Sequence, residues 1–312
     1  MAKRITILRR VRAIGEIILV QIGLLIIPLL PRRIILGIAR TLGSLVFRCA
    51  RRDRRVALAN VDLVYGDRMT GAAKHDLARA AFCSYALTML DLFWFTIFRQ
   101  RRLARYMEID PAVRHTLAEA VILITAHFGN WEVMGQAASR EGYRLAGVAK
   151  PIANPVVDAM LNRGRSRDGQ IVIPREGAMR RIVKLIRGGQ NYKLALLLDQ
   201  ETMPKEGGVF VEFFGVPTPI SGAPAELALR LNLPMAMIFC RWDQDRAKYL
   251  VYGSPVFRGE PGMTGESLTS DIAQRVEEEI RRHPESWLWM YKRWKHKLPG
   301  FPVERYPFYA DY

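Results

Sequence analysis

The stretch Val121-Ile-Leu-Ile-Thr-Ala-His127-Phe-Gly-Asn-Trp-Glu132 decides the fold. Its first five residues, 121–125, form a short continuous apolar run, which is typical of a parallel strand that is buried on both faces. Three later runs, at residues 194–198, 235–239 and 249–252, have the same character. Helix-like segments of about 10 to 20 residues alternate with these runs. The alternation predicts an α/β fold in which a central, mostly parallel sheet is layered by helices.

A possible catalytic pair follows the first predicted strand. In open α/β sheets ligands bind beyond the carboxyl ends of the strands, and His127 comes two residues after such an end. A histidine there can remove a proton from an alcohol, and a carboxylate can fix its tautomer and stabilise the imidazolium. Glu132 lies five residues further on, about 500° around a regular helix, so the two can meet only if His127 precedes the helix. Gly129 suits the tight turn that this requires. The alternative is a buried histidine bonded to backbone.

Composition and charge narrow the classes of function. Half of the 312 residues are hydrophobic, so a sizeable core can form. The three cysteines, Cys49, Cys83 and Cys240, have unrelated spacings and predict neither a disulfide framework nor a metal site. The formal net charge of +17 predicts an acidic partner, which could be nucleic acid, an anionic membrane or an acidic carrier.

The position of the charge favours the membrane. Residues 1–60 hold 13 lysines and arginines but only two acidic residues, Glu16 and Asp53. The same region contains the most apolar stretch, residues 14–30, which basic residues bracket on both sides. Basic residues beside an apolar helix are typical of contact with anionic head groups, and nucleic-acid binding does not require the apolar stretch. We therefore predict an N-terminal membrane-anchoring helix over residues 1–33 and no nucleic-acid partner.

How this helix meets the membrane stays open at the level of sequence. Its apolar stretch is at the short end for a span, and both of its flanks are basic, so it either lies in the cytoplasmic leaflet or spans the bilayer. Downstream, residues 34–60 are expected to form one amphipathic helix, and helical periodicity continues from Ala72 to about Arg102. Residues 269–282 are expected to form a charged helix. The chain shows no internal linker, so residues 34–312 are predicted to form a single domain.

Five blocks, in order along the chain, resemble one enzyme family. The string His-Phe-Gly-Asn-Trp-Glu at residues 127–132 resembles the His-x4-Asp/Glu motif of glycerolipid acyltransferases. It is more similar still to the form in the late (secondary) acyltransferases of lipid A biosynthesis, the lauroyl/myristoyl transferases, a family that includes bacterial phosphatidylinositol mannoside acyltransferases. The other blocks are Lys150-Pro-Ile-Ala-Asn-Pro with Gly164-Arg-Ser-Arg, Leu198-Asp-Gln, Gly208-Val-Phe-Val-Glu-Phe-Phe-Gly, and Pro284-Glu-Ser-Trp-Leu-Trp-Met-Tyr-Lys-Arg-Trp-Lys. In the second block lysine stands where arginine is usual, and in the fourth Glu212 stands where proline is common.

This resemblance implies a direct acyl transfer. His127 would deprotonate an acceptor hydroxyl with Glu132 supporting it, and the hydroxyl would attack a thioester carried by acyl carrier protein. The implied acceptor is a lipid A precursor, and the implied location is the cytoplasmic face of a bacterial inner membrane. The implied fold is the glycerolipid-acyltransferase-like α/β sheet, and no cofactor or metal is expected.

Five further residues are candidates for substrate binding. Asp199 and Gln200 follow the second predicted strand, where they could bind substrate or support a catalytic group. Asn130 could orient substrate or cap the helix that follows it. The forks of Arg165 and Arg180 could hold phosphate or contact the carrier, although a solvated helix face is the alternative for both.

Two rival functions remain at this stage. One is the same chemistry with another acceptor, such as a lysophospholipid or a lipoamino acid. The other is a basic, membrane-associated binding protein with an inert His–Glu pair. The remaining histidines (His75, His115, His283 and His296) have no partner that is evident from the sequence.

Overall fold

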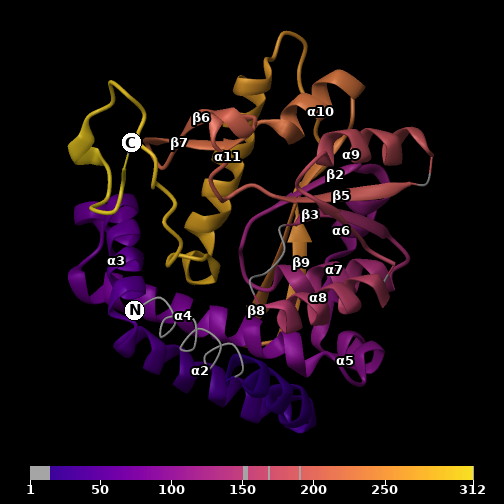
Figure 1. Cartoon of the computed structure of the whole chain (residues 1–312), viewed down its shortest axis with the longest axis vertical. Helices are drawn as coiled ribbons and strands as arrows, with labels where there is room; N and C mark the ends of the chain where they lie inside the picture. The colour runs from indigo at the N-terminus through magenta and orange to yellow at the C-terminus, as the bar shows by residue number, and fades with distance from the viewer. Residues whose placement is uncertain (1–14, 150–153, 168, 190, 312) are drawn as a thin grey trace, which may run out of the picture.

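The computed structural model describes residues 15–149, 154–167, 169–189 and 191–311. It confirms the predicted α/β fold with a mostly parallel sheet (Figure 1). Seven strands pair in the order β1-β9-β8-β2-β5-β3-β4. Only the β8–β9 pair in this sheet is antiparallel. The strands are β1 (Met107–Ile109), β2 (Ile122–Thr125), β3 (Arg144–Ala149), β4 (Ile171–Pro174), β5 (Tyr192–Leu197), β8 (Met235–Asp243) and β9 (Lys248–Gly253).

The helices and a small hairpin complete the fold. The hairpin consists of β6 (Gly208–Phe213) and β7 (Val216–Ser221), which pair antiparallel. The helices are α2 (Arg32–Cys49), α3 (Arg51–Tyr65), α4 (Gly71–Trp94), α5 (Arg99–Tyr106), α6 (Pro111–Glu119), α7 (Trp131–Arg140), α8 (Pro155–Arg167), α9 (Ala178–Arg187), α10 (Ala223–Leu231) and α11 (Gly265–Arg282).

All four apolar runs are strands, and the structure adds β1, β3 and β4 to the central sheet as well as the β6–β7 hairpin, none of which the sequence pattern predicted. β3 begins with a charged residue, Arg144, and contains Gly147, so it lacks a continuous apolar run. β4 has only four residues and ends in a proline. Both lie toward one edge of the sheet, where incomplete burial weakens the hydrophobic pattern.

Two cores cover the two faces of the central sheet. On β2, Ile122 and Ile124 face one core while Leu123 faces the other, because successive side chains of a strand point to opposite sides. Helices α9, α10 and α11 pack on the first face with the hairpin and with the C-terminal segment, which we define as residues 283–311. Helices α4, α5, α6 and α7 pack on the second face, together with part of α2.

The helical periodicity from Ala72 to about Arg102 is confirmed, although it divides into two helices, whereas the expectation of one helix over residues 34–60 is wrong. α2 ends at Cys49 and α3 begins at Arg51, because Ala50 between them leaves the helical conformation (ψ 71°). Likewise α4 ends at Trp94, and α5 starts only after Phe98, which has a left-handed backbone (φ 49°). The predicted charged helix at residues 269–282 is present as the greater part of α11.

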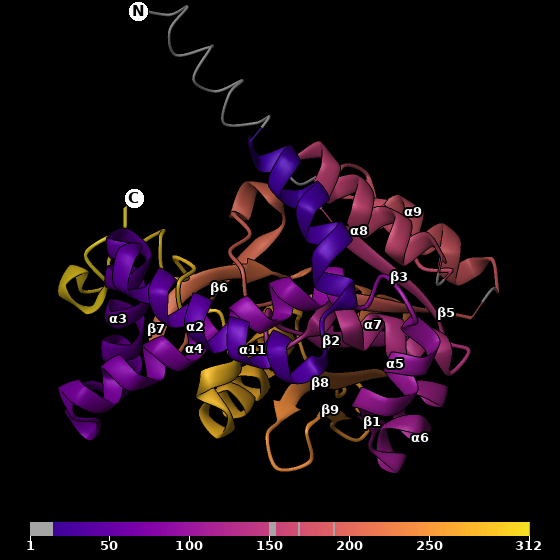
Figure 2. The same ribbon diagram turned by 90° about the horizontal axis from the view of Figure 1, so that it is seen from below.

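The N-terminal region packs along the body of the protein. Residues 15–26 are helical, and this helix lies beside α8 (Figure 2), where the Glu16 carboxylate accepts a hydrogen bond from Asn154 (3.4 Å). The predicted anchor boundary at residue 33 falls within the first turn of α2, which begins at Arg32. Residues 1–14 of the predicted anchor lie outside the described residues. In the part of the chain that the structure describes, no helix combines the length and apolarity needed to cross a bilayer.

Candidate active site

His127 lies where the sequence predicted, just beyond the carboxyl end of β2 and before α7. Two neighbouring strands bring a second functional group to it. β2 and β5 pair in parallel with Thr125 opposite Leu197, so His127 and Asp199 each stand two residues beyond a registered pair. The Nδ1 atom of His127 lies 2.8 Å from Oδ1 of Asp199. The histidine therefore has a carboxylate partner, but it comes from a different strand.

The Asp199 carboxylate is buried and hydrogen-bonded through both oxygens. Its side chain is 3% exposed, and its Oδ2 accepts a hydrogen bond from the indole nitrogen of Trp287 (2.9 Å). Burial alone would raise the pKa of this carboxyl, but the charge of His127 and the hydrogen bonds from His127 and Trp287 outweigh it and lower the pKa. Asp199 is therefore an anion that can stabilise an imidazolium beside it.

Glu132 does not contact His127 as the sequence pattern suggested. Its carboxylate is gripped by two nitrogens of the Arg165 guanidinium, with Nε 3.2 Å from Oε2 and Nη2 bonded to Oε1. Glu132 lies in the first turn of α7, and Arg165 lies near the end of α8, so this ion pair joins the two helices. The fork that was expected to hold phosphate is thus occupied by Glu132 in this structure, and phosphate binding by Arg165 stays a prediction.

The second ring nitrogen of His127 faces the side chain of Gln200. The amide nitrogen of Gln200 lies 3.2 Å from Nε2. If Nδ1 carries the proton that Asp199 accepts, Nε2 presents a lone pair, which is the form that a general base needs. The ring of Trp131 packs edge-on against the imidazole at 5.0 Å between centroids. Together, Asp199, Gln200 and Trp131 fix the orientation of the histidine, and 21% of its side chain remains exposed.

Asn130 caps helix α7, which is one of the two roles that the sequence left open for it. Its Oδ1 accepts a hydrogen bond from the backbone of Val133 (3.0 Å), and its Nδ2 lies 3.2 Å from the hydroxyl oxygen of Tyr249. The side chain is completely buried and caps α7, so it does not reach open space where substrate could bind.

Gly129 makes the turn between His127 and α7 possible. Its φ of +51° is in the left-handed region, and a Cβ atom there would lie 1.8 Å from the carbonyl oxygen of Cys240. The loop that carries His127 therefore passes against β8 more closely than any side chain would allow. The tight turn predicted at this glycine is confirmed.

An apolar cavity of ≈ 110 Å³ adjoins the His127 loop, between α7 and the second face of the sheet. Trp131, whose ring packs against the His127 imidazole, lies on its wall together with the Glu132–Arg165 pair, so the cavity begins next to the histidine. Most of the remaining lining is aliphatic and includes Leu123, Leu145, Ile171, Leu197, Ile238 and Val251. Such a lining suits a hydrocarbon chain.

Arg180 is not part of this site. It lies exposed on α9, which packs through Ile182 against the opposite face of the sheet from the cavity. His296, which has no evident partner in the sequence, is paired with Glu201 (Nδ1 to Oε2, 2.8 Å). Among the residues that the structure describes, no three His, Cys, Asp or Glu side chains gather in a way that could hold a metal ion.

Comparison with known proteins agrees with the five sequence blocks. The model of the bacterial lipid A biosynthesis acyltransferases matches residues 2–296. The chain is 23% identical over 280 residues to the lipid A biosynthesis lauroyltransferase of Escherichia coli (strain K12), which covers 88% of this chain and 89% of that protein. It is 24% identical over 234 residues to the phosphatidylinositol mannoside acyltransferase of Mycobacterium tuberculosis (strain ATCC 25618 / H37Rv), covering 72% of each. It is 21% identical over 279 residues to the lipid A biosynthesis palmitoleoyltransferase of Escherichia coli (strain K12), covering 87% of this chain and 88% of that protein. The chain belongs to the bacterial lipid A biosynthesis acyltransferase family.

Proposed function

We propose that this acyltransferase moves a fatty acyl chain from acyl carrier protein to a hydroxyl of a lipid A precursor, with His127 as the general base. The observation that carries the proposal is the His127–Asp199 pair, separated by the Trp131 ring from an apolar cavity that this ring also lines. A base that is oriented by a buried carboxylate activates an alcohol, and the cavity can hold the hydrocarbon chain that the alcohol receives.

The proposed reaction is a direct displacement. The Nε2 atom of His127 takes the proton of the acceptor hydroxyl while its oxygen attacks the thioester carbonyl carbon. The tetrahedral intermediate collapses with cleavage of the carbon–sulfur bond, and the imidazolium returns the proton to the leaving thiolate. Asp199 stabilises the imidazolium between these steps through Nδ1. The amide of Gln200, 3.2 Å from Nε2, must move aside or rotate for the hydroxyl to approach.

The donor is proposed to dock on a basic surface. Helix α9 exposes Arg180, Arg181, Lys184 and Arg187 and contains no acidic residue. A surface of one sign attracts an acidic protein such as acyl carrier protein, and the attraction weakens with salt. In this proposal, Arg180 contacts the carrier rather than the reacting groups.

The acceptor is proposed to arrive from a membrane along an apolar face on the N-terminal helices. Most of the large hydrophobic side chains that are exposed in the described structure lie on residues 15–29 and on α2. On α2 they recur at helical spacing, as Ile34, Ile38, Leu42 and Leu45, beside exposed arginines. An apolar face flanked by cations is typical of a helix that lies in the head-group region of a cytoplasmic leaflet.

Acyl transfer to purified acceptors tests the function. The protein, in detergent or in vesicles, is supplied with radiolabelled acyl-carrier-protein thioester and separately with a lipid A precursor, a lysophospholipid, a lipoamino acid or phosphatidylinositol mannoside. We expect labelled product with the lipid A precursor. For His127→Ala we expect an intact fold and a transfer rate that is lower by a factor on the order of 10²–10⁴. Labelling of only another acceptor would replace the substrate, and unchanged activity of His127→Ala would remove it as the base. No transfer to any acceptor would favour the rival view of a binding protein.

Membrane attachment needs a more selective test than truncation. Deleting residues 1–33 would also remove Arg32, which forms a buried ion pair with Asp91 inside the protein. The better variant is Leu42→Glu with Leu45→Glu, because both side chains are exposed and the core is unaffected. We expect it to shift protein from the membrane to the soluble fraction, whereas Val303→Glu, at an exposed apolar residue elsewhere, leaves the distribution unchanged. Equal membrane binding of all three proteins would contradict this face.

A further inference from the structure

The C-terminal segment packs against the loop that carries His127, residues 126–130. Trp287 forms an isolated antiparallel bridge with Phe128, and the backbone nitrogen of Gly129 donates to the carbonyl of Ser286 (2.8 Å). Trp287 is 2% exposed, and its indole nitrogen donates to Oδ2 of Asp199 (2.9 Å). One residue of this segment therefore contacts both halves of the proposed catalytic pair, the loop that bears the histidine and the carboxylate that supports it.

The hydrogen bond to Oδ2 determines which way the carboxylate faces. A carboxylate on a short side chain can rotate, and in this buried position water does not hold it. With Oδ2 bonded to the indole of Trp287, Oδ1 is the oxygen left for His127, 2.8 Å from Nδ1. Without the indole N–H, one oxygen of a buried anion would lack a partner, which is costly and favours other orientations.

We propose that Trp287 is a positioning residue of acyl transfer: its indole N–H fixes the Asp199 carboxylate so that Nδ1 of His127 keeps its proton and Nε2 stays available as the base. This inference rests on the proposed function of His127. The competing view is that Trp287 only fills the aromatic cluster that also contains Phe213, Trp289 and Trp294.

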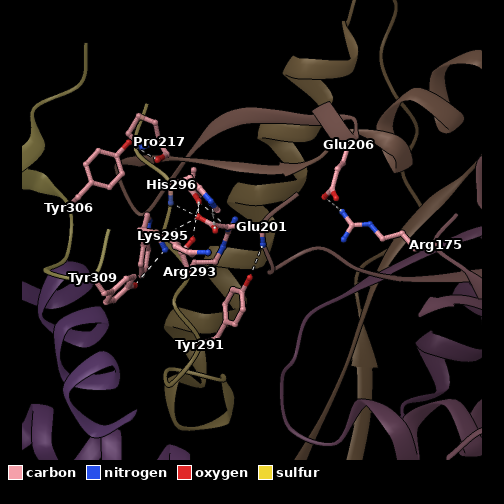
Figure 3. A network of polar contacts seen from close by, with 12 residues as sticks. Arg175, Glu201, Glu206, Pro217, Tyr291, Arg293, Lys295, His296, Tyr306 and Tyr309 are labelled. Carbon is pink, nitrogen blue, oxygen red and sulfur yellow. Dashed lines mark hydrogen bonds and ion pairs between the residues drawn. The ribbon is translucent and has the colours of Figure 1, made fainter. Parts of the chain in front are cut away.

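A second set of polar contacts joins Glu201, in the loop after β5, to the C-terminal segment (Figure 3). Glu201, two residues after Asp199, accepts hydrogen bonds from the backbone nitrogens of Lys295 (2.8 Å) and His296 (3.1 Å), and its other oxygen pairs with the His296 ring. The Tyr291 hydroxyl accepts a hydrogen bond from the backbone nitrogen of Glu201 (3.3 Å). The loop after β5 and the C-terminal segment are thus also joined after the Trp287–Asp199 contact, which restrains the position of the indole.

The chain offers a matched control for Trp287. Trp294 belongs to the same cluster, is completely buried, and donates its indole N–H to a backbone carbonyl, that of Phe213 (3.1 Å). Trp287→Phe and Trp294→Phe therefore remove the same atoms and one hydrogen bond each, but only the first removes a donor from the catalytic carboxylate. Replacing Trp287 by 3-benzothienylalanine removes only the N–H and keeps the ring size, which covers the case in which phenylalanine impairs folding.

We expect Trp287→Phe and the benzothienyl variant to lower kcat at least about tenfold with little change in the KM of the acceptor. Their acid limb of kcat/KM should also move to higher pH, because a carboxylate with one acceptor bond fewer stabilises the protonated imidazole more strongly. Trp294→Phe should keep the wild-type pH profile.

Several outcomes would overturn the assignment. If the benzothienyl variant has wild-type kcat and pH profile, the N–H does not position the carboxylate. If Trp287→Phe and Trp294→Phe lose activity equally with no change of profile, Trp287 is only a packing residue. A parallel measurement of His127→Ala distinguishes failure of this inference from failure of the proposed function. If His127→Ala keeps its activity, His127 is not the general base and the proposed function itself fails.

Discussion

Replacing Asp199 by asparagine should inactivate the enzyme by placing the histidine proton on the wrong nitrogen. The carboxylate accepts from two donors, His127 on one oxygen and Trp287 on the other. An amide has one acceptor and one donor end, so it cannot satisfy both. If its oxygen faces Trp287, its NH2 faces Nδ1 and drives the proton to Nε2. If its oxygen faces His127, its NH2 meets the indole N–H at about the present 2.9 Å separation.

The size of the effect follows from these two contacts. Loss of the charge-assisted hydrogen bond removes about 1.5–3 kcal/mol of imidazolium stabilisation. Reaching the productive tautomer requires the donor–donor contact, which costs a further ~1–3 kcal/mol for the unmade bond. The sum lowers kcat by about 10²–10⁴. The structure also predicts a reversal: Trp287→Phe should raise the activity of Asp199→Asn about tenfold, because it removes the donor that opposes the productive amide orientation.

Nitrogen NMR of histidine-labelled protein provides the direct assay beside the kinetics. In the wild type we expect the His127 proton on Nδ1, in Asp199→Asn on Nε2, and in Glu132→Gln on Nδ1 as before. Glu132→Gln is the decisive control because Glu132 is the carboxylate that the sequence motif suggested. If Glu132→Gln moves the proton and Asp199→Asn does not, or if Trp287→Phe further lowers the activity of Asp199→Asn, the reasoning from this geometry is refuted.

Three further predictions follow from single contacts. Gly129→Ala places a Cβ atom against the Cys240 carbonyl at a left-handed backbone position, so urea unfolding should show a loss of about 3 kcal/mol or more in the free energy of unfolding. Gly177→Ala is the control: its φ is +67° but the space around it is open, so it should lose only ~1–2 kcal/mol. Similar losses for the two variants would contradict the close approach at Gly129. Arg165→Lys keeps the charge but loses the planar guanidinium that holds the Glu132 carboxylate with two nitrogens. It should therefore impair acyl transfer nearly as much as Arg165→Ala, at both low and high salt. Wild-type activity of the lysine variant would rule out a role for the planar guanidinium. Because the pKa of Asp199 is lowered in the folded protein, its ionised form contributes stability at pH values above the ordinary aspartate pKa of 3.8. This contribution is lost as the pH falls through the lower native pKa, so the difference in unfolding free energy between the wild type and Asp199→Asn should shrink below pH 3.8. A difference that stays constant with pH would contradict the shift.

Local features of the chain were readable without the structure. The run 121–125 is a strand, His127 stands at its end, and Gly129 makes the turn before α7, because each depends on neighbours within a few residues. The assignment to the acyltransferase family also came from motifs that are contiguous in sequence. The spacing of Glu132 was equally visible, but in this structure Glu132 pairs with Arg165 and His127 is hydrogen-bonded to Asp199.

The sequence by itself determined an α/β acyltransferase with its histidine at a strand end, because apolar runs and short motifs encode strands, turns and family membership locally. Only the tertiary structure decided which carboxylate serves that histidine. The contact between His127 and Asp199 depends on β2 pairing with β5 rather than with any other strand, and the contact between Asp199 and Trp287 depends on a segment 88 residues further along folding back behind the loop. The hydrophobic periodicity of the sequence does not predict these contacts, because strand order and the path of the C-terminal segment depend on how all the helices and strands pack together.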